Sequence, residues 1–316
     1  MNGVVVSMPV KGGWALRAGL VICAVGLLAV ASGQALAKSK KHKPNKPAIS
    51  AHTPITRGSE YLALGDSVTF GYEEAQVVPA PNYNDASSFI GYPELLGSEL
   101  HVTVANAACP GETSLSFIDA TAQSNGCENS RTPGGAFYRM HPLHVSYSGS
   151  QLAFALSYLR KHKDVRLVSL MIGANDFLIC QETTADHCAS LAEQAGVLAA
   201  VGKDVRTIVS AIRNKADYGG QLAIVNYYSL DYSSQSTTAP IALLNSTIDN
   251  AAAPFRVEVA DGFGELEAGA LHSGGSTCNA GLLTQLVGAS SKCGIHPSYS
   301  GQALLAESVE KVVRLG

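Results

Sequence analysis

Short apolar segments alternate with amphipathic ones along most of the chain. The apolar segments are rich in Val, Ile, Leu and Ala and lack a polar face, as is typical of strands buried on both sides of a parallel sheet. Five strands are predicted: "YLALGD" (61–66), "VTVANAAC" (102–109), "VRLVSLMIGAND" (165–176), "QLAIVNYYS" (221–229) and "FRVEVADGF" (255–263).

Segments with helical spacing of apolar residues lie between and after these strands. The predicted helices are "SSFIGYPELLGSEL" (87–100), "SQLAFALSYLRKHK" (150–163), 191–212 and "SYSGQALLAESVEKVVRL" (298–315). Alternation of this kind implies right-handed crossovers and a roughly five-stranded parallel sheet covered by helices on both faces, an α/β fold. Two polar, Gly-rich stretches, 112–149 and 269–292, are expected to be irregular.

The first 37 residues read as a secretory signal peptide. Lys11 and Arg17 precede an uncharged apolar run at 18–31, and Ala35-Leu36-Ala37 supplies a small-x-small cleavage site. The run is short for a membrane span, although an uncleaved anchor stays open as the alternative. We therefore expect a secreted, extracellular protein.

Residues 38–59 form a basic, Pro-containing stretch that we expect to be disordered, because its prolines and like charges cannot build a core. Six of the 22 Lys and Arg residues lie within 38–60, and the whole chain has a formal charge of −3. The remainder is therefore acidic, which argues against nucleic-acid binding. The basic arm suits either a tether or weak contact with an acidic cell surface. Residues 60–316 suit one domain, which we expect to be a monomer.

Six cysteines remain once Cys23, inside the signal, is set aside. An even number in an exported chain indicates disulfides. Each neighbouring pair brackets a polar stretch between regular elements, so the sequence favours pairing of neighbours. The predicted disulfides are Cys109–Cys127, Cys180–Cys188 and Cys278–Cys293. No C-x-x-C or H-E-x-x-H pattern occurs, and neither a metal nor a cofactor is expected.

Polar residues follow the strands where a parallel sheet carries its sites, at the carboxyl ends. Ser67 follows the first strand, Gly111 the second and Asn175 the third, while His296 precedes the last helix. A serine hydroxyl is a poor nucleophile unless a base takes its proton. The oxyanion formed in acyl transfer needs rigid donors. These residue types together indicate acyl transfer.

The segments "GDSVTFG", "PGETS", "GANDF" and "GIHPSYSG" resemble, in this order, the four sequence blocks of the SGNH or GDSL hydrolase superfamily. The resemblance runs from Tyr61 to the C-terminus. It implies a three-layer α/β/α sandwich and a secreted esterase or lipase that hydrolyses small-molecule or lipid acyl esters. It also implies that Ser67 is the nucleophile and His296 the general base. The implied oxyanion donors are the backbone N–H groups of Ser67 and Gly111 and the side chain of Asn175.

One position departs from the superfamily pattern. An Asp usually lies three residues before the histidine, and this chain has Cys293 there. The orienting group need only accept the Nδ1–H of the imidazole, so we expect a Ser67–His296 dyad with the carbonyl of Cys293 as orienter. A carboxylate on His296 Nδ1 would overturn this expectation, and Asp261 is the first candidate.

The ester itself stays open at this stage. Tyr227 and Tyr228, and also Tyr232, follow the fourth strand and could line an acyl pocket. A carbohydrate O-acetyl esterase of the same fold is the first alternative. The only Trp, Trp14, lies in the signal, which leaves none to stack on sugar rings. A non-catalytic binding protein is the second alternative.

Overall fold

The computed structural model describes residues 50–316. The predicted signal peptide (1–37) and most of the predicted basic arm (38–59) therefore lie outside the described residues.

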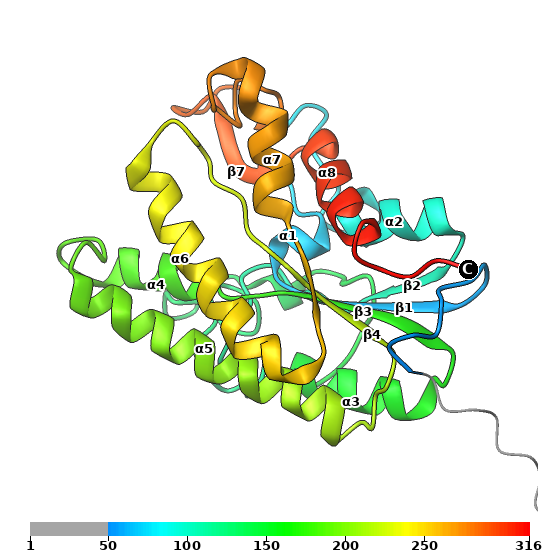
Figure 1. Ribbon diagram of the computed structural model, residues 1–316. Coiled ribbons are helices and arrows are strands. Elements are labelled where there is room, and N and C mark those ends of the chain that lie inside the picture. Colours follow the sequence, from blue (N-terminus) through cyan, green and yellow to red (C-terminus); the bar gives the residue numbers. More distant parts are fainter. Residues whose placement is uncertain (1–49) are drawn as a thin grey trace, which may run out of the picture. The chain divides into compact units, whose positions relative to one another are not determined.

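A five-stranded parallel sheet forms the centre of the fold (Figure 1), as the alternating pattern predicted. Its strands are β1 (Glu60–Gly65), β2 (Thr103–Asn106), β3 (Val165–Met171), β4 (Gln221–Val225) and β5 (Glu258–Ala260). Their order in the sheet is β2-β1-β3-β4-β5. Every residue of β4 is buried, which explains why this strand has no polar face.

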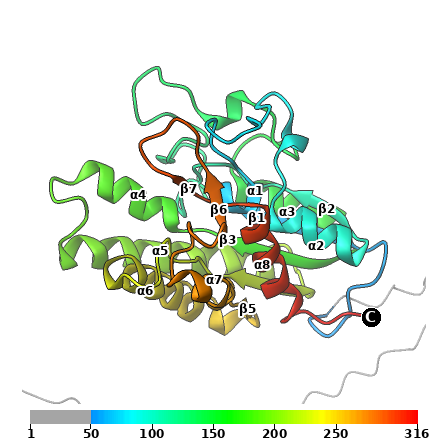
Figure 2. The same ribbon diagram turned by 90° about the horizontal axis from the view of Figure 1, so that it is seen from above.

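Helices cover both faces of the sheet and complete a three-layer α/β/α sandwich (Figures 1 and 2). They are α1 (Ser67–Phe70), α2 (Tyr92–Leu100), α3 (Gln151–Lys161), α4 (Ala174–Thr183), α5 (Leu191–Asn214), α6 (Gln235–Ala252), α7 (Gly262–Ala270) and α8 (Tyr299–Glu310). Helices α2, α7 and α8 pack together on one face, and α3, α5 and α6 on the other. Short 3₁₀ turns occupy Ala86–Ser88, Tyr138–Met140, Ala253–Phe255 and Leu271–Ser273.

The strand order fixes where a ligand can bind. The chain runs from β1 outward to β2 and then returns across the sheet to β3 on the opposite side of β1. Such a change of direction leaves a crevice at the carboxyl ends of β1 and β3, which is the usual ligand site of open α/β sheets. Ser67 follows β1 and Asn175 follows β3 directly, so both lie at this edge.

The helix predicted over 87–100 begins later than expected. Helix α2 begins at Tyr92, and Pro93 occupies its first turn. Proline has no N–H to donate to the carbonyl four residues earlier, so the helix cannot extend back through Phe89. Phe89 instead packs with Phe70 and Tyr138 in a second, smaller apolar cluster.

The Gly- and Ser-rich stretch 269–292 is more regular than expected. It contains β6 (Leu283–Gln285), which pairs antiparallel with β7 (Cys293–Pro297). This two-stranded ribbon leads directly into α8. Residue His296 therefore lies on a strand rather than on a loop before the last helix.

The end of the predicted disordered arm is packed against the domain. Ile55 is only 3% exposed and bridges Leu315 in parallel fashion. The side chain of Gln221 donates to the carbonyl oxygens of both Thr53 and Arg314, at 3.0 Å each. Apolar burial and these bonds outweigh the disorder favoured by the charges, so the ordered domain includes residues 53–59. Within residues 50–316, no helix combines the length and apolar character needed to cross a bilayer.

Replacing Ile55 with Ala tests this packing. The cavity left behind should lower the free energy of unfolding by about 2–5 kcal/mol. Urea unfolding of the two proteins measures the difference. Arg57→Ala, at an exposed position on the same segment, is the control and should change it by less than about 0.5 kcal/mol. An Ile55→Ala variant as stable as the wild type would show that this segment does not contribute to the stability of the domain.

Candidate active site

Ser67 is the first residue of the short helix α1, at the carboxyl edge of the sheet. The preceding Asp66 caps this helix, with its Oδ1 accepting from the N–H of Val68 at 3.0 Å. The cap fixes the backbone at Ser67, whose side chain faces a cavity. A strand end and a capped helix start thus hold the serine at the position that the sequence indicated.

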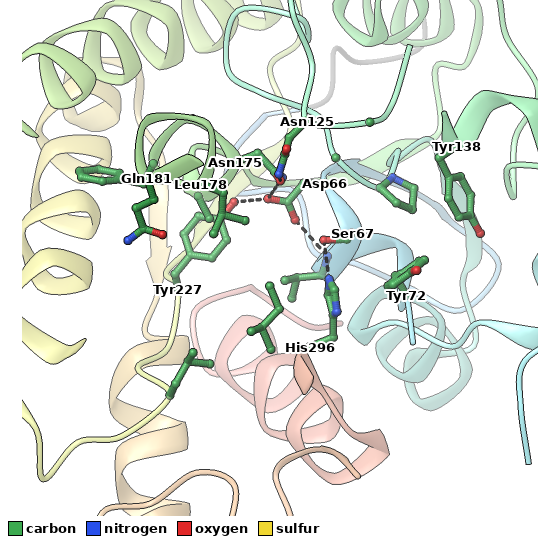
Figure 3. Close-up of a pocket in the computed structure, with 18 of the residues that line it drawn as sticks. Asp66, Ser67, Tyr72, Asn125, Tyr138, Asn175, Leu178, Gln181, Tyr227 and His296 are labelled. Carbon is green, nitrogen blue, oxygen red and sulfur yellow. Dashed lines mark hydrogen bonds between the residues drawn. The ribbon is translucent and has the colours of Figure 1, made fainter. Parts of the chain in front are cut away.

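The imidazole of His296 lies against this serine. Its Nε2 is 3.0 Å from Ser67 Oγ, and its Nδ1 is 2.7 Å from Oε1 of Glu74 (Figure 3 shows the serine–histidine bond). An ionised carboxylate can only accept, so Nδ1 carries the proton and Nε2 presents its lone pair to the serine hydroxyl. The three side chains form a hydrogen-bonded chain of carboxylate, imidazole and hydroxyl.

Both sequence-based candidates for the group that orients His296 are wrong. The carbonyl of Cys293 accepts instead from Ser291 Oγ at 2.6 Å. Cys293 and His296 lie on the extended strand β7, whose rise separates residues three apart by roughly 10 Å, too far for a bond between them. Asp261 caps α7 by accepting from the N–H of Gly264 at 2.9 Å.

Three hydrogen-bond donors hold the carboxylate of Glu74 beside the histidine, and the missing side chain of a glycine in β7 leaves space for it. Oε1 also accepts from the N–H of Ile295 at 3.1 Å, and Oε2 accepts from Thr284 Oγ1 at 2.6 Å. A Cβ at Gly294 would overlap the carboxylate, so only glycine leaves room for it there. Burial alone would raise the pKa of Glu74, but the bond and charge of His296, together with Thr284, lower it from 4.5 to about 2.

Sequence reasoning missed Glu74 because it searched near the histidine and at strand ends. The residue lies seven positions after Ser67 and 222 positions before His296. The available signal was a pair of acidic residues, Glu73-Glu74, close behind the "GDSVTFG" segment. The sequence does not show which of these two glutamates contacts the histidine, because that depends on how the β6–β7 ribbon packs against them.

The three expected oxyanion donors surround the same cavity. Ser67, Gly111 and Asn175 all line it. Gly111 has φ +85°, and a Cβ there would collide with the backbone of Asn125. In the described part of the chain, the backbone N–H groups of Ser67 and Gly111 have no acceptor, which leaves both free to bind an anionic oxygen.

The side chain of Asn175 has a defined orientation. Its Oδ1 accepts from Asn125 Nδ2 at 3.0 Å, and its Nδ2 lies 3.4 Å from Oδ2 of Asp66. Tyr227 donates its hydroxyl to the same Asp66 oxygen at 2.5 Å (Figure 3). Asp66 is 1% exposed, and burial raises its pKa to about 6 in spite of the bonds from Tyr227 and Val68.

The loop that carries Gly111 is anchored to helix α4. Asp176 accepts from both the N–H (2.9 Å) and the Oγ (2.7 Å) of Ser114. Asp176 follows Asn175 directly, so this pair of bonds fixes the separation between the segments that carry Gly111 and Asn175, the two expected donors besides Ser67. Burial raises the pKa of Asp176 to about 6, against the bonds from Ser114.

The cavity over Ser67 has a volume of about 600 Å³. Tyr72 and Tyr138 lie on one side of the serine, and Leu178, Gln181 and Tyr227 on the other (Figure 3). No Lys or Arg is among the described residues that line it. Its lining is mostly apolar and aromatic, as in sites for small organic ligands.

Two of the three tyrosines that follow β4 line the cavity. They are Tyr227 and Tyr228, and the hydroxyl of Tyr228 donates to the carbonyl of Ile295 at 2.5 Å. Tyr232 instead donates to the carbonyl of Phe263 at 2.7 Å and does not line the cavity.

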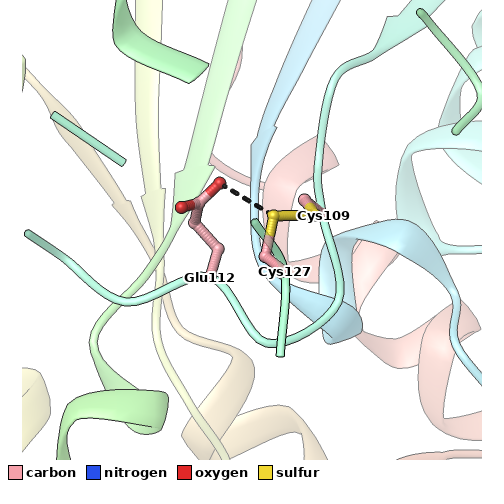
Figure 4. A group of neighbouring side chains, drawn as sticks. All are labelled: Cys109, Glu112 and Cys127. Carbon is pink, nitrogen blue, oxygen red and sulfur yellow. Dashed lines mark hydrogen bonds between the residues drawn. A yellow bond between two sulfur atoms is a disulfide. The ribbon is translucent and has the colours of Figure 1, made fainter. Parts of the chain in front are cut away.

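The three disulfides in the structure join the expected pairs of neighbours: Cys109–Cys127, Cys180–Cys188 and Cys278–Cys293. The last ties the first residue of β7, the strand of His296, to the preceding loop. Glu112 lies against the first disulfide (Figure 4), with a carboxylate oxygen 3.6 Å from Cys127 Sγ. Because metals bind cysteine as the thiolate, this oxidised pair does not make a ligand set with Glu112.

The pKa of Glu74 predicts a pH-dependent stability. A carboxyl whose folded-state pKa is lowered stabilises the fold above its ordinary pKa, and this stabilisation is lost as the pH falls toward about 2. The unfolding free energy of the wild type should therefore exceed that of Glu74→Gln most at pH 5–6, and the difference should shrink below pH 4.5. Urea unfolding of both proteins between pH 3 and 6 measures it.

Glu73→Gln is the matched control, because burial and the charge of Glu74 raise the pKa of Glu73. Its ionised form is disfavoured in the fold, so removing it should help stability as the pH rises, opposite in sign to Glu74→Gln. The same pH trend in both variants would show that the two carboxyls are not distinguished as described.

The chain is similar to several solved structures at low sequence identity. A phospholipase A1 from Streptomyces albidoflavus NA297 is 17% identical, with a TM-score of 0.53 over 81% of this chain and 100% of its own. A lipase from a goat rumen metagenome is 15% identical, with a TM-score of 0.50 over 80% and 96%. An acetylxylan esterase from Geobacillus stearothermophilus is 14% identical, with a TM-score of 0.49 over 82% and 95%. A comparison with curated proteins found no match.

The sequence model of the GDSL-like lipase/acylhydrolase family matches residues 63–304. This range includes Ser67, Glu74, Gly111, Asn175 and His296, and it covers most of the chain. The chain therefore belongs to the GDSL-like lipase/acylhydrolase family and is a carboxylic ester hydrolase.

Proposed function

We propose that the protein is a secreted serine esterase or lipase that hydrolyses acyl esters through an acyl-enzyme on Ser67. The observation that carries the proposal is the hydrogen-bonded chain from Glu74 through His296 to Ser67, at 2.7 and 3.0 Å. A serine paired with an imidazole that is itself oriented by a carboxylate is the arrangement that activates a hydroxyl.

In the first half of the reaction, His296 Nε2 takes the proton of Ser67 Oγ as this oxygen attacks the ester carbonyl carbon. The carbonyl electron pair moves onto oxygen, which accepts hydrogen bonds from the N–H groups of Ser67 and Gly111 and from Asn175 Nδ2. These donors need no rearrangement when the charge forms, and such preorganisation is usually the largest contribution to the rate. The ester C–O bond then breaks, and His296 gives its proton to the leaving alcohol.

Water completes the cycle. His296 takes a proton from a water molecule, whose oxygen attacks the acyl carbon, and the bond to Ser67 Oγ breaks as the serine recovers its proton. Glu74 remains ionised throughout. It keeps the Nδ1 proton in place and stabilises the imidazolium that forms in each half, because its pKa of about 2 prevents it from taking the proton.

The lining of the cavity supports an uncharged ester with an acyl chain as the substrate. Tyr72 packs its ring on His296, with centroids 4.8 Å apart. Since His296 protonates the leaving oxygen, the aromatic side suits the alcohol. The acyl chain then lies on the opposite side, the side of Leu178 (Figure 3), and Ile241 and Leu244 add apolar surface to the lining. The described lining contains no Lys or Arg, the usual partners of a phosphate group.

The two alternatives receive less support. A carbohydrate O-acetyl esterase binds a sugar rich in hydroxyl groups as its alcohol, whereas this cavity is lined mostly by apolar and aromatic side chains. A non-catalytic binding protein has no need of a carboxylate on His296 Nδ1 or of unpaired N–H groups beside the serine hydroxyl. Export is supported by the signal-like segment 1–37 and by the three disulfides, which suit an oxidising compartment.

Nitrophenyl esters from acetyl to palmitoyl test the proposed substrate class. Initial rates should rise from acetyl to longer chains and fall to background in Ser67→Ala, because an apolar acyl site gains free energy with each buried methylene. Rates confined to the acetyl ester would favour the carbohydrate deacetylase. If no ester is hydrolysed in a Ser67-dependent way, the non-catalytic binding protein becomes the favoured interpretation.

Glu74→Gln tests the proposed carboxylate. The amide keeps the size of the side chain but loses the charge that stabilises imidazolium, so kcat should fall by roughly 10²–10⁴ with little change in KM. Steady-state kinetics on the preferred nitrophenyl ester measures both. The neighbouring Glu73→Gln should stay within about threefold of wild type. A Glu74→Gln enzyme with wild-type kcat would reduce the site to a serine–histidine dyad.

A further inference from the structure

We propose that Asn125 is a positioning residue that sets the oxyanion hole, by fixing which end of the Asn175 carboxamide faces the reacting carbonyl. The proposal rests on the proposed function of the same site. Asn125 lies in the irregular stretch 112–149, outside the four sequence segments that identify the family, and no role follows for it from those segments.

Asn125 is bonded to both segments that bring oxyanion donors to Ser67. Its backbone N–H donates to the carbonyl of Gly111 at 2.7 Å, and its side-chain Nδ2 donates to Asn175 Oδ1 at 3.0 Å (Figure 3). The carbonyl oxygen of Asn125 in turn would overlap a Cβ at position 111, so the two segments pack tightly. One residue therefore holds the glycine loop by its backbone and the α4 amide by its side chain.

The orientation of Asn175 matters because a carboxamide has two unlike ends. Its NH₂ can donate to a developing oxyanion, whereas its carbonyl oxygen would repel one. The bond from Asn125 occupies that carbonyl oxygen and so leaves the NH₂ for the reaction. The Asp66 carboxylate, 3.4 Å from Asn175 Nδ2, favours the same orientation through a longer contact. Asn175 is 4% exposed, so water does not replace a lost bond readily.

The loop around Asn125 is itself rigid. The disulfide Cys109–Cys127 joins the residues that precede Gly111 to those that follow Asn125 (Figure 4). The hydroxyl of Ser124 accepts from the N–H of Cys127 at 3.0 Å, and the carbonyl of Gly126 accepts from the N–H of Tyr138 at 2.7 Å. Because the backbone on both sides of Asn125 is fixed, its side chain can set the orientation of the Asn175 carboxamide.

Asn125→Asp is the sharpest test, since it keeps the shape and replaces the NH₂ with an oxygen. That oxygen repels Asn175 Oδ1 and attracts Asn175 Nδ2, so the amide should turn and present its carbonyl to the oxyanion. We expect kcat to fall by roughly 10²-fold or more, as for loss of one oxyanion donor, with KM within about threefold. Asn125→Ala, which frees the amide without turning it, should lose less, about 3- to 30-fold. Asn250→Asp, the same change at an exposed site on α6, should match wild type.

A double-mutant cycle separates positioning from other roles. If Asn125 acts through Asn175, then Asn125→Asp and Asn125→Ala should each change kcat by less than about threefold in an Asn175→Ala background. Thermal unfolding of every variant is recorded alongside, and the Ala cycle decides the matter if the Asp variant does not fold.

Equal, additive losses in both backgrounds would overturn the proposal and assign Asn125 to direct contact with substrate or to loop stability. So would wild-type kcat in Asn125→Asp. These results are distinguishable from failure of the proposed function, in which the wild type itself shows no Ser67-dependent hydrolysis.

Discussion

The bond between the carboxylate of Glu74 and Nδ1 of His296 is the interaction on which the site depends. It joins a loop that follows the first strand to the ribbon before the last helix, across 222 residues of sequence. A carboxylate with little exposure is costly unless donors satisfy it, and here the histidine, a threonine hydroxyl and a backbone N–H do so. The same bonds that make its burial tolerable bring the imidazole to the serine. The same bonds therefore hold the β6–β7 ribbon in place and set His296 against Ser67.

The rest of the site follows from the sheet. Reversal of strand order between β1 and β3 opens a crevice at their carboxyl ends, and Ser67, Gly111 and Asn175 reach it from three successive crossovers. Hydrogen bonds between these crossovers, from Ser114 to Asp176 and from Asn125 to Asn175, set their spacing. The apolar cavity lies over this rigid polar floor. The walls of the cavity contribute mostly apolar and aromatic surface, with few polar side chains such as Gln181 and Thr237.

The sequence predicted what depends on local pattern and chain order. The five strands of the sheet, the serine and histidine beside the crevice, and the pairing of neighbouring cysteines could all be inferred, because each reflects short-range pattern or loop closure. Glu74 and Asn125 could not, since each acts through a contact made only when distant segments pack. Cys293 was expected to orient His296 because it occupies the position where the superfamily pattern has Asp, but the chain there is an extended strand. The packing of Ile55 on the domain was not predicted, because the basic composition of the arm indicates disorder and one apolar side chain does not change that pattern.

Covalent labelling of Ser67 by a fluorophosphonate, followed by intact mass and peptide mapping, tests the central claim most directly. It reports the reactivity of the serine and requires no knowledge of the natural ester. We predict a single adduct on the Ser67 peptide in the wild type, labelling slowed by roughly 10²-fold or more in Glu74→Gln, and none in His296→Ala on the same timescale. An adduct on another residue, or labelling of Ser67 at the wild-type rate in both variants, would contradict the account.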